Sequence, residues 1–164
     1  MDIKLKLEDV GQLQALLRQF PAIAERHLAG AINEGVMLLQ REIAEATPTG
    51  ANQLLRKSIK GETAKSTGGQ LLGVVGTALD YAIPVELGTQ PHFPPVAPLE
   101  DWVVAKLGIE RRMAHGVAYL IARKIAAKGT QGAFMFKRTV AAQEGYINGL
   151  FKAAVAKTVQ ELGR

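Results

Sequence analysis

Apolar and charged side chains alternate over the first eight residues of the chain. Positions 3, 5 and 7 are apolar and positions 4, 6 and 8 are charged, and this period of two predicts a half-buried β-strand. Asp9 stands where it can cap a short helix, whose apolar residues at positions 13, 16, 17 and 20 share one stripe. The chain is therefore predicted to begin with a strand followed by a short helix.

Farther along the chain, apolar residues recur every three or four positions, which predicts amphipathic helices. The predicted helices cover residues 22–46, 98–107, 110–127 and 133–162. In the second helix, the residues expected to point inward are Leu99, Trp102, Val103 and Leu107. In the third helix, the expected inward face carries Met113, Val117, Leu120, Ile121 and Ile125.

Two glycines, Gly30 and Gly35, interrupt the first long helix. A glycine inside a helix costs about 1 kcal/mol relative to alanine. We therefore expect these positions to mark places where another part of the backbone comes close.

The segment between the first and second long helices has the pattern of strands and turns. A Ser-Thr-Gly-Gly turn signal at 66–69 lies within residues 60–77, which predicts a β-hairpin that projects from the body of the protein. Residues 81–98 hold five of the seven prolines. A short helical turn that ends at Gly88 is expected first, and an extended Pro-rich loop is expected over about 88–98.

This order of elements predicts an α+β fold. A small antiparallel sheet, formed by the N-terminal strand and the central hairpin, is expected to pack against the long amphipathic helices. The length of 164 residues suits a single domain spanning residues 1–164.

The composition narrows the possible functions. The chain has no cysteine, which excludes disulfide scaffolds, thiolate metal sites and cysteine nucleophiles. No apolar run approaches the roughly 18 residues of a membrane-spanning helix, and no secretory signal is visible. We therefore expect no membrane partner and a location in the cytoplasm of the cell that makes the protein.

The charge is unevenly distributed. Residues 1–100 carry 9 basic and 11 acidic residues, whereas residues 101–164 carry 11 basic and 4 acidic residues. The basic C-terminal third could contact nucleic acid, or its charges could simply solvate helix faces, since no block of like charges occurs. The candidates for facing DNA are Arg111, Arg112, Arg123 and Lys124.

Few residues suggest catalysis. None of the three histidines has metal-ligand spacing, and we expect no catalytic, metal or cofactor site. Glu86 lies between Val85 and Leu87 beside a loop. It could serve as a general base with His92 in a small hydrolase, but a carboxylate that binds loop N–H groups or an arginine is the favoured interpretation.

Three stretches together resemble the tail-completion (tail-component, or head–tail joining) family of long-tailed bacteriophages and prophages. One runs from Tyr81 to Thr89 and continues into the Pro-rich loop and Trp102. The second runs from Ala122 to Gly132 and is followed by two phenylalanines. The third, at 47–59, is the weakest. The resemblance spans roughly residues 45–140.

This resemblance implies a structural virion protein without enzymatic activity. Members of the family look like neck components that form homo-oligomeric rings between the tail tube and the head connector. The implied partners are therefore further copies of the chain, tail-tube proteins, head-connector or tail-terminator proteins, and the DNA that passes through. The implied location is the virion, with assembly in the host cytoplasm.

The motifs also supply candidates for subunit contacts. Phe93 and Trp102 are the best anchors, because buried aromatic side chains often dominate interface energies, although Trp102 fits core packing equally well. The full set of expected contact residues is Tyr81, Glu86, Thr89, Phe93, Pro94, Trp102, Lys128, Thr130, Phe134 and Phe136.

Overall fold

The computed structural model describes residues 2–4, 21–50, 52–67 and 70–162. The chain forms two compact units. Unit 1 comprises residues 1–46, 59–77 and 136–164, and unit 2 comprises residues 47–58 and 78–135. The short helix expected after Asp9 lies outside the described residues, and the single domain stays a prediction.

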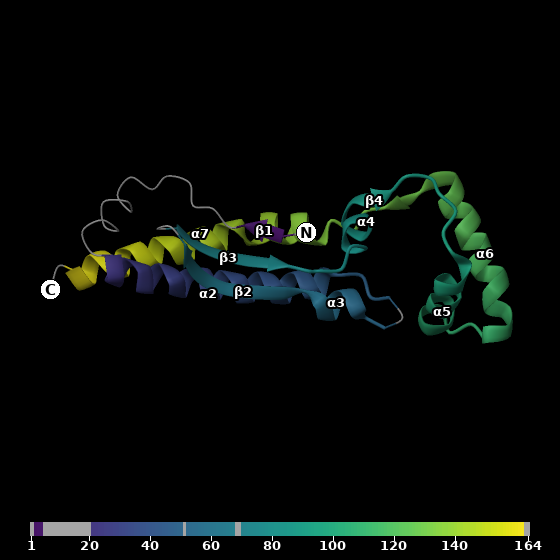
Figure 1. The fold of residues 1–164 in the computed structure, drawn as a ribbon, viewed down its shortest axis with the longest axis horizontal. Coiled ribbons are helices and arrows are strands. Elements are labelled where there is room, and N and C mark those ends of the chain that lie inside the picture. Colours follow the sequence, from purple (N-terminus) through teal and green to yellow (C-terminus); the bar gives the residue numbers. More distant parts are fainter. Residues whose placement is uncertain (1, 5–20, 51, 68–69, 163–164) are drawn as a thin grey trace. The chain divides into compact units, whose positions relative to one another are not determined.

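Unit 1 contains a three-stranded antiparallel sheet (Figure 1). The strands are β1 (Asp2–Lys4), β2 (Lys60–Thr67) and β3 (Gln70–Gly76), in the order β1-β3-β2. β1 pairs with the end of β3, so that Ile3 lies opposite Val75. The predicted α+β fold is thus confirmed, with the N-terminal strand beside the central hairpin.

The helix α2 (Pro21–Ala46) packs closely on this sheet because two strand residues lack side chains. A Cβ atom placed on Gly73 would lie 2.5 Å from Cγ2 of both Ile32 and Val36. A Cβ atom on Gly61 would lie 2.5 Å from Cγ1 of Val36. The glycines therefore let β-branched helix residues rest on the strand backbones, and they make any larger residue a steric obstacle.

Two amide side chains of α2 bind backbone N–H groups of the edge strand β2. The N–H of Gly61 donates to Oε1 of Gln40 at 2.7 Å, and the N–H of Ala64 donates to Oδ1 of Asn33 at 2.7 Å. Ala64 lies where the β2–β3 register shifts, at a bulge between Glu62 and Lys65. The helix thus satisfies donors that an edge strand would otherwise expose for pairing with another chain.

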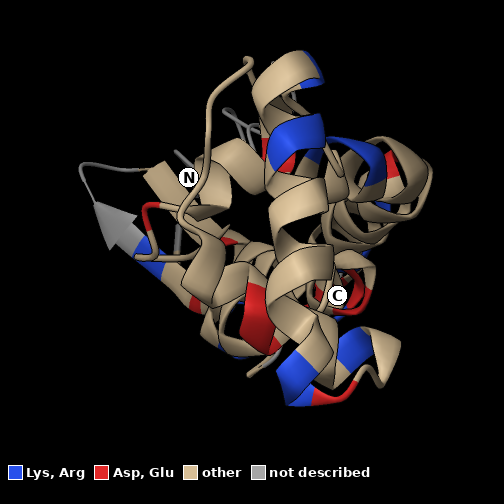
Figure 2. Ribbon diagram, turned by 90° about the vertical axis from the view of Figure 1, so that its right-hand side faces the viewer, with Lys and Arg blue, Asp and Glu red and all other residues tan. Residues whose placement is uncertain are grey.

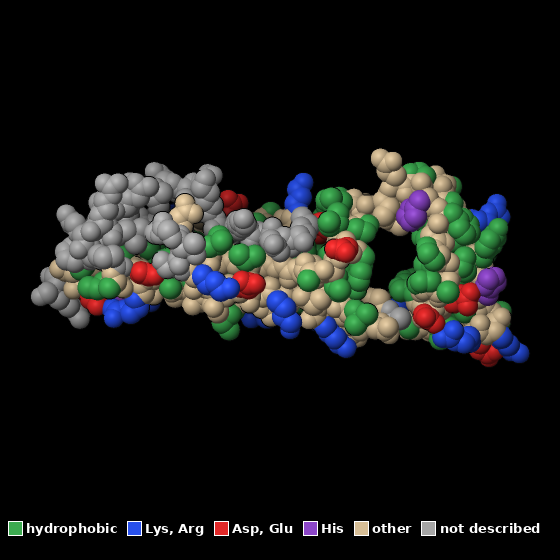
Figure 3. All heavy atoms as spheres, viewed as in Figure 1, with side chains coloured by type: hydrophobic (Ala, Val, Ile, Leu, Met, Phe, Trp, Pro, Cys, Tyr) green, Lys and Arg blue, Asp and Glu red, His purple; other side chains and the backbone are tan. Residues whose placement is uncertain are grey.

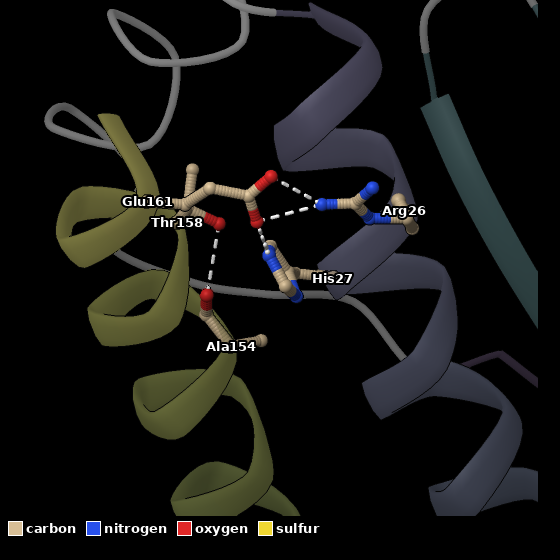
Figure 4. Close-up of polar contacts among 5 residues, drawn as sticks. All are labelled: Arg26, His27, Ala154, Thr158 and Glu161. Carbon is tan, nitrogen blue, oxygen red and sulfur yellow. Dashed lines mark hydrogen bonds and ion pairs between the residues drawn. The ribbon is translucent and has the colours of Figure 1, made fainter. Parts of the chain in front are cut away.

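The long C-terminal helix α7 (Met135–Leu162) runs antiparallel to α2, as their side-chain contacts show. Near one end of the pair, Glu161 accepts hydrogen bonds from Arg26 at 2.5 and 2.6 Å and contacts Nε2 of His27 at 2.8 Å (Figure 4). Farther along, the hydroxyl of Tyr146 donates to Glu34 at 2.7 Å. Polar contacts between these two helices are thus spread over several helical turns.

Unit 2 holds the remaining elements. They are α3 (Leu54–Ser58), α4 (Ala82–Leu87), β4 (Gly88–Thr89), α5 (Val96–Leu107), α6 (Arg111–Lys128) and β5 (Thr130–Gln131). The predicted helical turn that ends at Gly88 corresponds to α4. None of the described helices combines the length and apolar character needed to cross a membrane.

The α5–α6 pair has an inner face made of small residues. Val103 of α5 and Ala114 and Ala118 of α6 are completely buried and form the centre of this cluster. Alanines at this spacing allow two helices to approach closely.

The predicted inward faces of these two helices need correction. Leu107 is 50% exposed, Met113 is 61% exposed and Leu120 is 63% exposed, so all three lie on the outside. The face of α6 that is buried carries Ala114, Ala118 and Ala122, which the predicted inward face did not include.

Candidate assembly interface

Two of the sequence motifs, about 40 residues apart, meet in unit 2. The strands β4 and β5 pair antiparallel, with Gly88 opposite Gln131 and Thr89 opposite Thr130. Beyond β5, the N–H of Ala133 donates to the carbonyl oxygen of Val85 at 2.9 Å, and the N–H of Phe134 donates to that of Glu86 at 3.0 Å. We call residues 85–89 together with residues 129–134 the β4–β5 junction.

Glycines make the β4–β5 junction sterically possible. Gly88 has φ +82° and ψ 179°, and Gly129 has φ +68° and ψ −161°, a region of backbone conformation that is essentially restricted to glycine. A Cβ atom on Gly88 would collide with the carbonyl oxygen of Thr130, and one on Gly129 with that of Thr89. The motif glycines are therefore required for the two backbones to approach.

The two threonines of the junction support the pairing with their side chains. Their hydroxyl oxygens lie 2.9 Å apart, and the N–H of Thr130 donates to Oγ1 of Thr89 at 3.1 Å. The hydroxyl of Thr89 thus contacts both the side chain and the backbone N–H of Thr130. The Gly-Thr pairs of the two motifs thus have a structural role, because together they form the β4–β5 junction.

Two of the ten candidate contact residues do not reach the surface. Glu86 and Phe136 both have 0% exposure. Neither side chain is accessible at the surface of the protomer, and a part of either residue in subunit contacts stays a prediction. Burial also argues against Glu86 as a general base, since a base must reach the proton it removes.

The other eight candidates all have accessible side chains. Phe93 is 54% exposed and Tyr81 is 45% exposed. Trp102 is half-buried against the α5–α6 cluster, so this tryptophan takes part in core packing. The remaining five are half-buried or exposed: Thr89, Pro94, Lys128, Thr130 and Phe134.

Apolar side chains gather on the outside of unit 2. The ring of Phe93, in the Pro-rich loop, lies 6.0 Å from that of Tyr119 on α6, at an angle of 60°. Figure 3 shows apolar side chains along α6 on its visible face. The large exposed apolar side chains of α4, the Pro-rich loop and α6 are Tyr81, Ile83, Leu87, Phe93, Met113, Tyr119 and Leu120. The sequence analysis singled out Tyr81 and Phe93 as contact candidates but placed Met113 and Leu120 in the core. It did not single out Ile83, Leu87 or Tyr119, because a helical period does not show which apolar residues stay exposed.

The four candidate DNA-facing residues fall into two pairs. Arg111 forms an ion pair with Asp101 at 2.6 Å, and Arg112 forms one with Glu110 at 2.6 Å. Arg123 and Lys124 are exposed and have no ion-pair partner within the described part of the chain. Figure 2 shows basic and acidic residues interspersed along the ribbon. Half of the predicted basic set is thus neutralised locally.

The described residues contain no cluster of three or more potential metal ligands. Nδ1 of the exposed His92 lies 2.9 Å from the carbonyl oxygen of Gln90, a contact within its own loop. His115 contacts Glu100 of α5 at 2.7 Å, and His27 contacts Glu161. Each histidine thus has a structural contact.

In unit 2, two sequence motifs thus pair through glycines, and large apolar side chains are exposed. The family model described as "Bacteriophage HK97-gp10, putative tail-component" matches residues 11–88. This match confirms the resemblance to a phage tail-component family and supports a structural tail protein. No curated protein and no solved structure is significantly similar to the chain.

The matched segment ends at Gly88, the first residue of β4. It therefore includes α2, the hairpin and α4, but not the motif that follows Ala122. The structure pairs the end of the matched segment with that second motif through the β4–β5 junction.

Proposed function

We propose that the protein is a tail-completion or neck subunit of a phage or prophage, which self-associates into a ring between the tail tube and the head connector. The observation that carries this proposal is the family match over residues 11–88. The exposed apolar surface of unit 2 supports it, since such patches on soluble proteins commonly mark contacts with other proteins.

The proposal includes a virion location, assembly in the host cytoplasm, and tail-tube and head-connector or tail-terminator proteins as partners. It includes no catalytic activity, no cofactor and no metal. A ring requires head-to-tail contacts between two different surfaces of the subunit. The Pro-rich loop suits such a contact, because prolines reduce the conformational entropy lost when a loop docks.

The first test is the native mass of the purified protein, measured by light scattering over a concentration series and combined with electron micrographs. Closed rings of uniform size are expected. A protein that stays monomeric and also fails to co-assemble with its tail-tube protein would contradict the proposal.

A substitution in the Pro-rich loop sharpens this test. Phe93→Ser removes an exposed aromatic side chain, and Leu54→Ser is a matched control on α3, where the leucine is 57% exposed. We expect Phe93→Ser to weaken assembly by roughly tenfold and Leu54→Ser to leave it unchanged. If the two variants assemble equally strongly, the Pro-rich loop is not part of the interface.

One alternative has an observation of its own. Arg123 and Lys124, exposed on α6, could bind DNA phosphates, either in a separate nucleic-acid-binding protein or beside the DNA path of a ring. Binding through phosphates weakens steeply as salt rises. No binding of duplex DNA at about 50 mM salt, where such contacts are strong, would eliminate this alternative.

A further inference from the structure

The outer face of α6 carries a continuous stripe, the α6 outer stripe, which consists of Met113, Gly116, Leu120 and Lys124. These residues are three or four positions apart, so they follow one another along one side of the helix. All four are exposed, Met113 to 61% and Leu120 to 63%. A Cβ atom on Gly116 would meet nothing within 4 Å, so no neighbouring group of the described chain explains this glycine.

The outer face of α2 also carries a stripe with an exposed glycine and a large apolar residue. This α2 outer stripe consists of Gly30, Glu34, Met37, Arg41 and Glu45. These residues are also exposed, and Met37 is 71% exposed. A Cβ atom on Gly30 would likewise meet nothing within 4 Å. The expectation that another backbone approaches Gly30 is therefore not met within the described protomer. Gly61 and Gly73, by contrast, lie directly against side chains of α2.

The two helices carry opposite charge. α6 has five basic residues and no acidic residue, whereas α2 has four acidic and two basic residues. On the stripes themselves, Lys124 and the adjacent Arg123 follow Leu120, while Met37 lies between Glu34 and Arg41, with Glu45 one turn farther along. The one basic residue of the α2 outer stripe, Arg41, forms an ion pair with Glu42 at 2.8 Å. Of its two acidic residues, Glu34 accepts a hydrogen bond from Tyr146.

We propose that the α6 outer stripe of one protomer docks on the α2 outer stripe of a second copy of this chain. Each stripe offers a large apolar side chain and an open glycine, so the large residue of one helix can approach the backbone of the other. The two helices have net charges of opposite sign, which favours this pairing over the pairing of two stripes of the same kind. This proposal rests on the proposed function and adds the surfaces that the ring uses.

Such a contact joins two different surfaces, so each surface can be disrupted separately. Leu120→Glu destroys the α6 outer stripe and leaves the α2 outer stripe intact, whereas Met37→Glu does the reverse. Each variant alone should lose self-association by roughly tenfold or more in dissociation constant. An equimolar mixture still contains one intact pair of surfaces and should form 1:1 dimers that cannot grow.

Leu107→Glu and Val159→Glu are matched controls, since these residues are exposed to 50% and 53% but lie outside both stripes. Both controls should assemble as the wild type does. Light scattering measures the mass of each sample, and circular dichroism establishes that each variant is folded. Association of the wild type should also weaken as salt rises, because opposite charges at the rim are screened.

The remaining outcomes overturn the proposal. Unchanged assembly of either stripe variant would exclude its stripe from the contact, and a mixture that forms no dimers would exclude the pairing of α6 with α2. A wild type that is monomeric at every concentration would exclude this self-association, whereas the proposed tail role would still be tested by co-assembly with the tail-tube protein.

Discussion

The core of unit 1 and the α5–α6 pair of unit 2 bury side chains of different size. In unit 1, large residues such as Leu39, Ile43 and Phe136 are completely buried. The strand glycines Gly61 and Gly73 leave room for Ile32 and Val36 of α2. In the α5–α6 pair of unit 2, the fully buried residues are one valine and three alanines. Large apolar side chains of that unit, including Leu120, lie outside. The core of unit 1 thus contains large side chains, whereas the contact between α5 and α6 is made mostly of small ones. This difference predicts that large-to-small substitutions in the two places affect stability differently.

The largest test of this comparison is a large-to-small substitution in each unit. Phe136→Ala should lower the free energy of unfolding by about 3–5 kcal/mol, because a fully buried aromatic side chain leaves a cavity. Leu120→Ala should change it by less than about 0.5 kcal/mol, as is usual for exposed positions. Urea unfolding of both variants measures the difference, and similar losses would refute the contrast between the units.

A second test adds one methyl group to a glycine. Gly73→Ala should cost about 1–3 kcal/mol, since its Cβ would overlap Ile32 and Val36 and force the helix away from the sheet. Gly116→Ala meets open space and should stabilise α6 by about 0.5–1 kcal/mol. Thermal unfolding of the two variants should therefore shift in opposite directions, and a stabilised Gly73→Ala would show that α2 is not packed so tightly.

A smaller effect is expected at the β4–β5 junction of unit 2. Thr89→Val removes the oxygen that accepts the N–H of Thr130 and should cost about 1 kcal/mol. Thr130→Val removes only the contact between the hydroxyls and should cost less. Hydrogen exchange at the Thr130 amide should become faster in Thr89→Val, and equal exchange in both variants would contradict the assigned acceptor.

The smallest effect concerns the ion pair between the ends of α2 and α7. Hydrogen bonds from Arg26 and His27 lower the pKa of Glu161 below its ordinary value of 4.5. A lowered pKa in the folded state stabilises the protein above pH 4.5, and this contribution is lost as the pH falls through the lowered value.

The melting temperature of Glu161→Gln should therefore lie slightly below that of the wild type at pH 6, and the two should converge in acid. Because the pair is exposed, the difference should be small. A difference in melting temperature that grows as the pH falls would contradict the lowered pKa assigned to Glu161.

Local patterns in the sequence determined much of this protein. The structure contains elements predicted from three local patterns. These patterns are the alternation that begins at position 3, the hairpin signals at 60–77 and the long helical period of 22–46. These predictions succeed because each element needs one apolar face with a fixed period. The motif ending in Gly88-Thr89 was likewise visible, because its glycine and prolines are strong local signals.

Only the tertiary structure decided which stripe of α6 is buried and which segments meet. Periodicity places apolar residues on faces, but the neighbouring element selects the face, and α5 selects Ala114 and Ala118 over Met113 and Leu120. The pairing of Thr89 with Thr130 depends on a contact between distant residues, which no local pattern encodes. The same holds for Gly73, whose role follows from the helix that lies against it.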